Sequence, residues 1–271
     1  MYNMMKIENL RDIECFVFDM DGTLYLGNNV IEGAHELIAL LEEKGIKYFY
    51  FTNNSSRSPM EYVARLNRLG FAGVTLDKIL TSGHVMIHYL KTHFDAPKVF
   101  LCGTPALESQ FKEAGITLLP AEKESCDAVV IGFDTTMDYK KMDNACRLIA
   151  NGAPFLATNI DRVCPLEGGA FMIDCGSMCR AIEHATGKEA KFTGKPFPET
   201  VDYILAAAGT EKRKTAMVGD RFYTDVMTAI NGGIVSIAVL SGEATLEELE
   251  AAKEPIDYIL TSVDEIYQAL K

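Results

Sequence analysis

The chain has 271 residues, of which 48% are hydrophobic and 24% charged, and these proportions are those of a folded protein rather than a disordered one. Its 26 basic and 38 acidic residues give a net charge of −12, which argues against nucleic acid or an anionic membrane as a partner. An acidic protein that binds an anionic substrate must therefore supply positive charge locally, at the site itself.

The apolar runs and the cysteines of the sequence indicate the cellular compartment. No apolar run reaches the roughly 18 residues that a membrane helix needs, and the first residues lack the apolar segment of a signal peptide. The seven cysteines are an odd number and form no Cys-x-x-Cys pair. We therefore expect reduced, mostly buried thiols and a cytoplasmic protein.

Apolar runs and helical patterns alternate along the chain. The strands are expected at 14–22, where the strand runs into a turn, and at 47–54, 99–103, 127–134, 155–159, 215–220, 233–239 and 256–260. Helices are expected between them, at 34–44, 56–70, 104–115, 138–152, 176–187, 197–209 and 224–233. This alternation predicts an α/β protein with a doubly wound parallel sheet.

Polar side chains follow three of the predicted strands at the point where each strand ends. Asp19 and Asp21 follow the first strand, Thr52 and Asn53 the second, and Asp220 a much later one. Ligands of open α/β sheets bind outside the carboxyl ends of the strands. These residues are therefore candidates for one shared site.

The most restrictive of these segments is Asp19-Met20-Asp21-Gly22-Thr23. Two aspartates two residues apart can hold a hard cation and still leave one carboxylate to react. Gly22 allows a tight turn whose amide groups can face an anion.

Four such segments together resemble the motifs of the haloacid dehalogenase superfamily of phosphohydrolases. They are Asp19-Met20-Asp21-Gly22-Thr23, Phe51-Thr52-Asn53-Asn54, Gly194-Lys195-Pro196, and Val218-Gly219-Asp220-Arg221 with Asp225. Taken singly, each also fits an ordinary turn, a surface charge or a helix cap. Their joint occurrence in this order implies a Rossmann-like core and a Mg²⁺-dependent phosphatase that acts on a small phosphorylated metabolite.

The resemblance gives each residue an expected role. Asp19 is the nucleophile, and Asp21 is first the general acid and then the general base. Mg²⁺ is expected to bind Asp19, Asp220 and the backbone carbonyl of Asp21, with Asp225 orienting this set. The phosphoryl group is expected to contact Gly22, Thr52, Asn53, Asn54 and Lys195.

A cap domain is expected between the second and third motifs, because roughly 140 residues separate Asn53 from Lys195. We expect the catalytic core at 1–82 and 189–271 and an inserted α/β cap at 83–188. This layout resembles the NagD-like or 4-nitrophenylphosphatase-like subfamily. A homodimer through the cap is one assembly that we consider.

One cap segment, Ala157-Thr158-Asn159-Ile160-Asp161, resembles a subfamily segment that faces the active site. That resemblance makes Asn159 and Asp161 candidates for substrate contact, while a polar turn after a strand is an equally good interpretation. Further on, Met172-Ile173-Asp174-Cys175-Gly176 stands where relatives usually carry Pro-Gly-x-Gly. Because the cap contributes specificity, this departure leaves the substrate unassigned.

Three other functions remain as alternatives. A phosphotransferase or mutase would return the phosphoryl group to an alcohol and would need a cap that excludes water. A non-catalytic sensor of phosphorylated metabolites would not need all four motifs. A dehalogenase fits least, because Asp21, Lys195 and the acidic metal set suit phosphoryl transfer better.

Overall fold

The chain forms two compact units in a computed structural model that describes residues 7–120, 123–166 and 169–271. The core unit joins Met1–Thr52, Pro59–Leu80 and Lys195–Lys271, and the inserted unit joins Asn53–Ser58 and Thr81–Gly194. Residues 53–58 group with the inserted unit, whose main part ends at Gly194.

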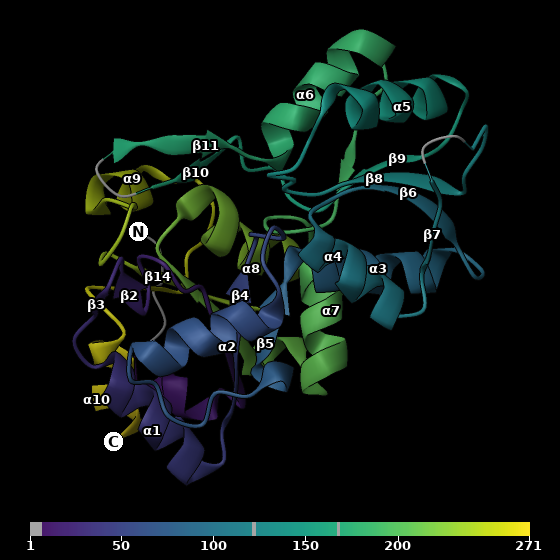
Figure 1. Cartoon of the computed structure of the whole chain (residues 1–271). Coiled ribbons are helices and arrows are strands. Elements are labelled where there is room, and N and C mark those ends of the chain that lie inside the picture. Colours follow the sequence, from purple (N-terminus) through teal and green to yellow (C-terminus); the bar gives the residue numbers. More distant parts are fainter. Residues whose placement is uncertain (1–6, 121–122, 167–168) are drawn as a thin grey trace. The chain divides into compact units, whose positions relative to one another are not determined.

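The core unit is built on a six-stranded sheet (Figure 1). Its order is β15-β14-β13-β1-β4-β5, from strands at Cys15–Phe18 (β1), Lys47–Thr52 (β4), Ile79–Thr81 (β5), Thr215–Gly219 (β13), Val235–Val239 (β14) and Tyr258–Leu260 (β15). The pairs β1–β13, β1–β4, β13–β14 and β14–β15 are parallel, as the strand–helix alternation predicts. A short antiparallel ribbon, β2 (Tyr25–Leu26) with β3 (Asn29–Val30), follows β1.

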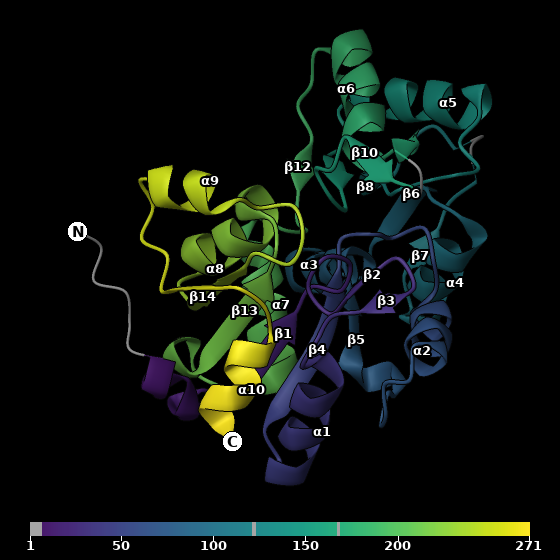
Figure 2. The same cartoon turned by 90° about the vertical axis from the view of Figure 1, so that its left-hand side faces the viewer.

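Successive side chains of a strand point to opposite faces of the sheet, so both faces of the core sheet carry apolar side chains. Helices cover these apolar faces. The α-helices of this unit are α1 (Ala34–Lys44), α2 (Pro59–Arg68), α7 (Pro198–Ala208), α8 (Met227–Gly232), α9 (Leu246–Ala251) and α10 (Asp264–Leu270). The alternate β1 residues Phe16 and Phe18 pack in one apolar cluster with α1 and α10, which lie side by side (Figure 2). On α8, Gly232 approaches α7 so closely that a Cβ there would lie 2.2 Å from the Val201 side chain.

Shorter helical turns complete this unit. Among its described residues, three are 3₁₀-helical, η1 (Ile7–Asp12), η2 (Leu76–Lys78) and η4 (Lys212–Lys214), and η5 (Phe222–Val226) is π-helical. The helix predicted at 224–233 is therefore a π-helical turn that continues into α8. π-Helical turns are rare and frequently lie at functional sites.

The inserted unit has its own parallel sheet, ordered β12-β9-β8-β6-β7. Its strands are Lys98–Cys102 (β6), Thr117–Leu118 (β7), Ala128–Ile131 (β8), Phe155–Ala157 (β9) and Lys191–Phe192 (β12). Its helices are Ser82–His93 (α3), Pro105–Glu113 (α4), Tyr139–Ala150 (α5) and Cys175–Thr186 (α6). Two apolar clusters place α5 and α6 on one face of this sheet and α3 and α4 on the other (Figure 1).

An antiparallel hairpin of the inserted unit was not expected from the sequence. It pairs β10 (Val163–Pro165) with β11 (Phe171–Ile173), and the side chains of Phe171 and Ile173 are exposed. The unusual segment from Met172 to Gly176 thus ends this hairpin, and Asp174 caps the start of α6. In the part of the chain that the structure describes, no helix is both long and apolar enough to cross a membrane.

Candidate active site

Three of the predicted residues lie at one edge of the core sheet. Asp19 follows β1, Thr52 is the last residue of β4, and Asp220 follows β13. Because β1 lies between β13 and β4 and all three run in parallel, their carboxyl ends adjoin. The backbone amide of Asp19 also donates to the Val218 carbonyl at 2.8 Å. The hydrogen bonding between β1 and β13 therefore extends to Asp19, the predicted nucleophile.

The loop after Asp19 is a tight turn that depends on Gly22. The amide of Gly22 donates to the carbonyl of Tyr25 at 2.7 Å, and its φ of +92° lies in the left-handed region that favours glycine. A Cβ at this position would lie 2.2 Å from Oδ2 of Asp220. Glycine is therefore required both by the turn and by the closeness of Asp220.

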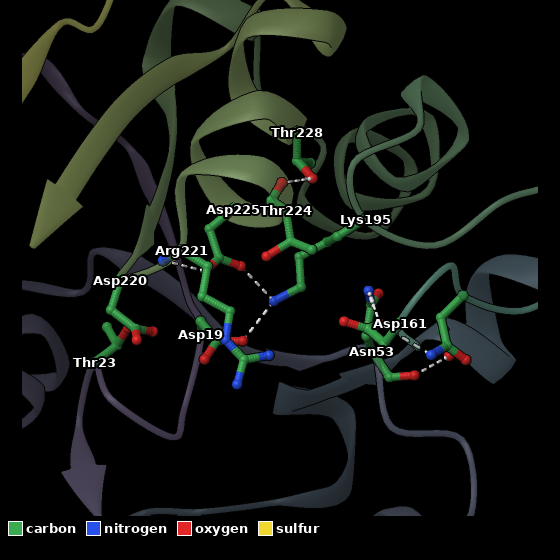
Figure 3. Close-up of polar contacts among 12 residues, drawn as sticks. Asp19, Thr23, Asn53, Asp161, Lys195, Asp220, Arg221, Thr224, Asp225 and Thr228 are labelled. Atoms are coloured by element: carbon green, nitrogen blue, oxygen red, sulfur yellow. Dashed lines mark hydrogen bonds and ion pairs between the residues drawn. The ribbon is translucent and has the colours of Figure 1, made fainter. Parts of the chain in front are cut away.

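Lys195 places a buried positive charge at the same edge. Its side chain is 2% exposed, and its Nζ donates to Oδ1 of Asp19 at 2.5 Å and to Oδ1 of Asp225 at 2.6 Å (Figure 3). Burial alone would lower the pKa of Lys195, but the two carboxylates outweigh it and raise that pKa. The acidic chain thus carries a fixed cation where a phosphoryl group would approach Asp19.

A carboxylate cluster beside Lys195 has the chemistry of a divalent-cation site. Among the described residues, one oxygen each from Asp19, Asp220 and Asp225 lies within 4.8 Å of the other two. Burial and the nearby Asp19 charge raise the pKa of Asp220 to about 6, and burial raises that of Asp225 to about 7. Hard cations prefer carboxylate oxygens, and a cation here would relieve the repulsion within the cluster, so the donor set fits.

Asp21 has electrostatics suited to proton transfer. Desolvation, followed by the Asp19 carboxylate, raises the pKa of Asp21 above its usual value. Nearby Arg65 opposes this rise. A carboxyl group with a raised pKa can hold a proton closer to neutral pH, as a general acid must.

The segment after β14, which carries none of the four motifs, holds Asp220 and the Gly22 loop in place. The hydroxyl of Ser241 donates to the Gly22 carbonyl at 2.7 Å, and the amide of Glu243 donates to Oδ2 of Asp220 at 2.9 Å. Gly242 lies so close that a Cβ there would be 2.0 Å from the same Oδ2. On the opposite side, the Thr23 hydroxyl donates to Oδ1 of Asp220 at 3.2 Å.

The candidate residues of the inserted unit form a separate hydrogen-bond network. Nδ2 of Asn159 donates to Oδ2 of Asp161 at 2.9 Å and to Oδ1 of Asp174 at 3.0 Å, while its Oδ1 accepts from Thr158. Asn159 is 0% exposed, and both of its amide protons are used. In this arrangement its side chain can affect a ligand only through its partners.

Asp161 receives a second hydrogen bond, from Asn53, whose Nδ2 donates to Oδ2 at 2.7 Å (Figure 3). Asn53 belongs to the 53–58 segment, which forms several hydrogen bonds with the rest of the inserted unit. For example, the Ser55 hydroxyl contacts Oγ1 of Thr158 at 3.1 Å and accepts from the amide of Phe133. These bonds explain why a segment predicted in the core groups with the inserted unit.

Asn54 has local partners in the same segment. Its Oδ1 accepts from the amide and the hydroxyl of Ser56, at 2.9 and 2.7 Å, and its Nδ2 lies 3.9 Å from Sγ of Cys164. The first two bonds form an Asx turn, which shapes the chain just after Thr52.

The contributions of Ser241, Gly242 and Glu243 are not predicted by the four motifs, and Arg221 belongs to the fourth motif without a predicted role. The signal for the first two was present, because Ser241 and Gly242 follow a predicted strand that neighbours β13. Small polar residues at strand ends marked the rest of the site in the same way.

Comparison with protein-family models gives two matches, the first of which extends into the inserted unit. Residues 16–117 match a model described as haloacid dehalogenase-like hydrolase, and residues 192–266 match one described as HAD-hydrolase-like. A curated relative, acid sugar phosphatase of Staphylococcus saprophyticus, is 31% identical over 262 residues, which are 97% of this chain and 100% of the relative.

Solved structures resemble this chain over nearly its whole length. The 4-nitrophenylphosphatase of Thermotoga maritima has a TM-score of 0.90 at 39% identity, and the match covers 98% of this chain and 100% of that one. NagD of E. coli K-12 has a TM-score of 0.85 at 28% identity, with 93% of this chain and 98% of that one covered.

Proposed function

Because the chain belongs to the haloacid dehalogenase-like hydrolase family and is a phosphatase of its NagD-like subfamily, we propose that it hydrolyses small phosphomonoesters at Asp19. The observation that carries this proposal is the pairing of Lys195 with both Asp19 and Asp225 at adjoining strand ends. A phosphate ester and a carboxylate nucleophile repel each other, and this buried ammonium offsets the repulsion.

In the first step, a carboxylate oxygen of Asp19 attacks phosphorus and the bond from phosphorus to the leaving oxygen breaks. Lys195 stabilises the charge on the phosphoryl oxygens, and Thr52 at the neighbouring strand end donates its hydroxyl to them. Asp21 gives its proton to the leaving oxygen. The product alcohol departs, and an aspartyl phosphate remains.

In the second step, Asp21, now a carboxylate, takes a proton from a water molecule. The water oxygen attacks phosphorus, the bond to Asp19 breaks, and inorganic phosphate is released. The raised pKa of Asp21 supports this double role, because the same group must hold a proton in one step and accept one in the next.

Members of this family generally use a divalent metal, and we propose Mg²⁺ for this chain. Asp19, Asp220 and the backbone carbonyl of Asp21 would hold it. When bound, it would supply positive charge that draws electron density from the phosphoryl group. Asp225, whose oxygens accept from Lys195 and from the amide of Arg221, is proposed to orient this set.

The inserted unit is proposed to act as the cap that selects the leaving group. Within it, Asp161 is the residue proposed to contact the substrate, and Asn53 and Asn159 hold its carboxylate through Oδ2. Asn159 thereby becomes a positioning residue rather than a direct contact. The proposed contacts of Asn53 and Asn54 with phosphate stay predictions.

Sugar phosphates are the proposed natural class, and aryl phosphates a convenient artificial one. The support is that curated relatives are named acid sugar phosphatase and solved relatives 4-nitrophenylphosphatase. The seven cysteines, all free thiols, support a reducing cytosol as the compartment. A homodimer through the cap stays a prediction.

The test is a turnover assay on the metal-stripped protein. Sugar phosphates, phosphoglycolate, nucleotides and 4-nitrophenyl phosphate are each supplied without metal and then with Mg²⁺, Mn²⁺ or Ca²⁺, and inorganic phosphate is measured. We expect release that requires a divalent ion and is fastest with Mg²⁺. Transfer of phosphate to an added alcohol without release would instead indicate a phosphotransferase, and tight binding without turnover would indicate a sensor.

A further inference from the structure

Arg221 is a cation at the catalytic edge that the mechanism above does not use. It follows Asp220 and precedes the π-helical turn η5. Its backbone is fixed at both ends, because its amide donates to Oδ2 of Asp225 at 3.1 Å and its carbonyl accepts from the amides of Asp225 and Val226 at 3.0 and 3.3 Å. The side chain therefore starts from a rigid position at the end of β13.

The guanidinium group of Arg221 lies beside Asp19 (Figure 3). Burial lowers the pKa of Arg221, but the nearby acidic groups, first Asp19 and then Tyr223, outweigh it and raise that pKa. The side chain is 26% exposed, so it reaches solvent at the open side of the site while most of it is enclosed. Such a group can meet a ligand without moving far.

The hydrogen-bonding capacity of this guanidinium is largely unused. Nε lies 2.9 Å from Oε2 of Glu243, but the angles are not those of a hydrogen bond. The two terminal nitrogens have no hydrogen-bond partner among the residues that the structure describes. A guanidinium carries five N–H donors, and those of the partly exposed terminal nitrogens can exchange water for a suitable acceptor.

The shape and charge of the group indicate which acceptor fits. A phosphoryl group that reacts with Asp19 must lie next to that carboxylate, where Lys195 offers only a point charge. The planar fork of an arginine pairs with two phosphoryl oxygens at once, which a lysine cannot do. Glu243 approaches the fork at Nε, so it orients the guanidinium and can leave the terminal nitrogens available.

We propose that Arg221 binds the phosphoryl group of the substrate through its two terminal nitrogens, with Glu243 as the positioning residue. This inference rests on the proposed phosphatase site and adds a second cationic contact to Lys195. Arg221 thereby becomes a catalytic residue, because the charge on the phosphoryl oxygens grows during transfer and the fork is already in place.

The experiment compares Arg221→Gln, Arg221→Lys and a control, Arg213→Gln. Arg213 is exposed and pairs only with nearby Glu211 in the described structure, so its loss should change nothing at the site. For each protein we measure inhibition by inorganic phosphate and orthovanadate, kcat and KM for 4-nitrophenyl phosphate, and the Kd of the divalent metal by calorimetry without substrate.

For Arg221→Gln we expect phosphate and vanadate inhibition to weaken at least tenfold and kcat/KM to fall about 100-fold. Arg221→Lys should recover part of the inhibition and part of kcat/KM, because lysine keeps the positive charge but lacks the planar, two-nitrogen geometry of arginine. Metal affinity should stay equal or tighten, since a positive charge has left the neighbourhood of the metal ligands. Glu243→Gln should preserve phosphate inhibition within a few-fold and lower kcat, because it affects only orientation.

Two results would overturn this inference while leaving the phosphatase proposal intact. One is unchanged phosphate inhibition in Arg221→Gln, combined with weaker metal binding, which would mean that Arg221 only balances the carboxylates. The other is a fall of kcat/KM in Arg221→Gln that is confined to substrates with a second anionic group, which would mean that the guanidinium binds the leaving group. Absence of turnover in the unaltered protein would instead refute the proposed function itself.

Discussion

The ammonium group of Lys195 bridges two carboxylates in the core, so its contacts serve both stability and reactivity. Asp225 is 1% exposed at its side chain, and its negative charge there depends on Lys195. Removing one partner of a buried ion pair leaves the other uncompensated. The proposed phosphate-binding residue is therefore also a structural one, and the two effects must be separated by a matched variant.

For Lys195→Met we predict a loss of about 3–5 kcal/mol in the free energy of unfolding, together with loss of turnover for every ester. The double variant Lys195→Met with Asp225→Asn should recover much of the stability and none of the activity, because it no longer buries an unpaired charge. Urea unfolding and 4-nitrophenyl phosphate turnover report the two quantities. Equal stability of Lys195→Met and the unaltered protein would contradict the pairing.

For Asp19→Asn we predict that turnover is abolished while the fold persists. The amide is nearly isosteric and can still accept from Lys195 through its oxygen, but it is a poor nucleophile and a weaker metal ligand. The exposed Asp77→Asn makes the same chemical change outside the site and should remain fully active. More than a few per cent of residual activity in Asp19→Asn would rule out attack by this carboxylate.

Among the elements, the segment from Ser241 to Ala244 shows how a loop without a motif can shape a metal site. Its amides contact Asp220 twice, once at Oδ2 and once at the backbone carbonyl, where Ala244 donates at 2.8 Å. Neighbours that orient a metal ligand typically change metal affinity by 10- to 100-fold when altered.

We therefore predict that Gly242→Ala weakens binding of the divalent metal at least tenfold, because the new Cβ must displace the Asp220 carboxylate. Gly83→Ala is the control, since its Cβ would meet the flexible ends of Gln110 and Leu107 in the inserted unit. Calorimetric titration of both metal-stripped variants measures the difference. If both bind metal alike, the segment does not orient Asp220.

The start of α3 carries a pH-sensitive cap. His84 and the N-cap residue Thr81 form a reciprocal capping box, and burial lowers the pKa of His84 to about 4. Because the folded pKa lies below the unfolded value of about 6.5, the neutral imidazole contributes stability above pH 6.5, and this contribution falls as the pH drops toward 4.

His84→Gln keeps a capping side chain that does not titrate. Relative to this variant, the unaltered protein should lose up to about 3 kcal/mol of unfolding free energy between pH 6.5 and pH 4. Urea unfolding at several pH values measures the difference between the two. Parallel stability curves across this range would show that His84 titrates normally.

Much of the fold could be predicted from elements whose signal is local. The strand of Lys47–Thr52 is a largely aromatic run, and the helix of Pro59–Arg68 begins with proline, a residue favoured at the first helical position. The hairpin of β10 and β11 and the two-residue strand β12 have no comparable signal, because their pairing depends on partners distant in the sequence.

The same distinction applies to the candidate site. Asp19, Thr52 and Asp220 could be predicted together because parallel strands bring their carboxyl ends to one edge. The burial of Asn159 between Asp161 and Asp174 could not, since hydrogen-bond partners 15 residues apart leave no periodic pattern. Arg221 was visible in the motif, but only the structure shows that its terminal nitrogens have no partner among the described residues.

At the scale of the whole molecule, the proposal divides the work between the two units. Chemistry belongs to the core unit, and choice of the leaving group belongs to the inserted unit. Asp161→Ala should therefore lower kcat/KM most for sugar phosphates, whose hydroxyl groups can bond to a carboxylate, and least for 4-nitrophenyl phosphate. Because binding energy from remote groups can act on either parameter, kcat and KM are measured separately.

Thr52→Ala, in the core unit, is the matched variant for this comparison. It removes a donor to the phosphoryl group itself, so it should slow every ester to a similar degree. The proposed roles of the two units would be contradicted if Asp161→Ala lowered kcat/KM equally for all esters while Thr52→Ala changed the order of kcat/KM among them.

The central claim is that phosphate passes through a covalent bond to Asp19, and the Asp21→Asn variant tests it most directly. Without the general base the second step should stall, while 4-nitrophenolate leaves readily without a general acid. We predict a burst of one equivalent of 4-nitrophenolate per protein and, after acid quenching, mass spectrometry that locates one phosphoryl group on Asp19. Steady 4-nitrophenolate release without a burst, or a phosphoryl group on another residue, would contradict the account.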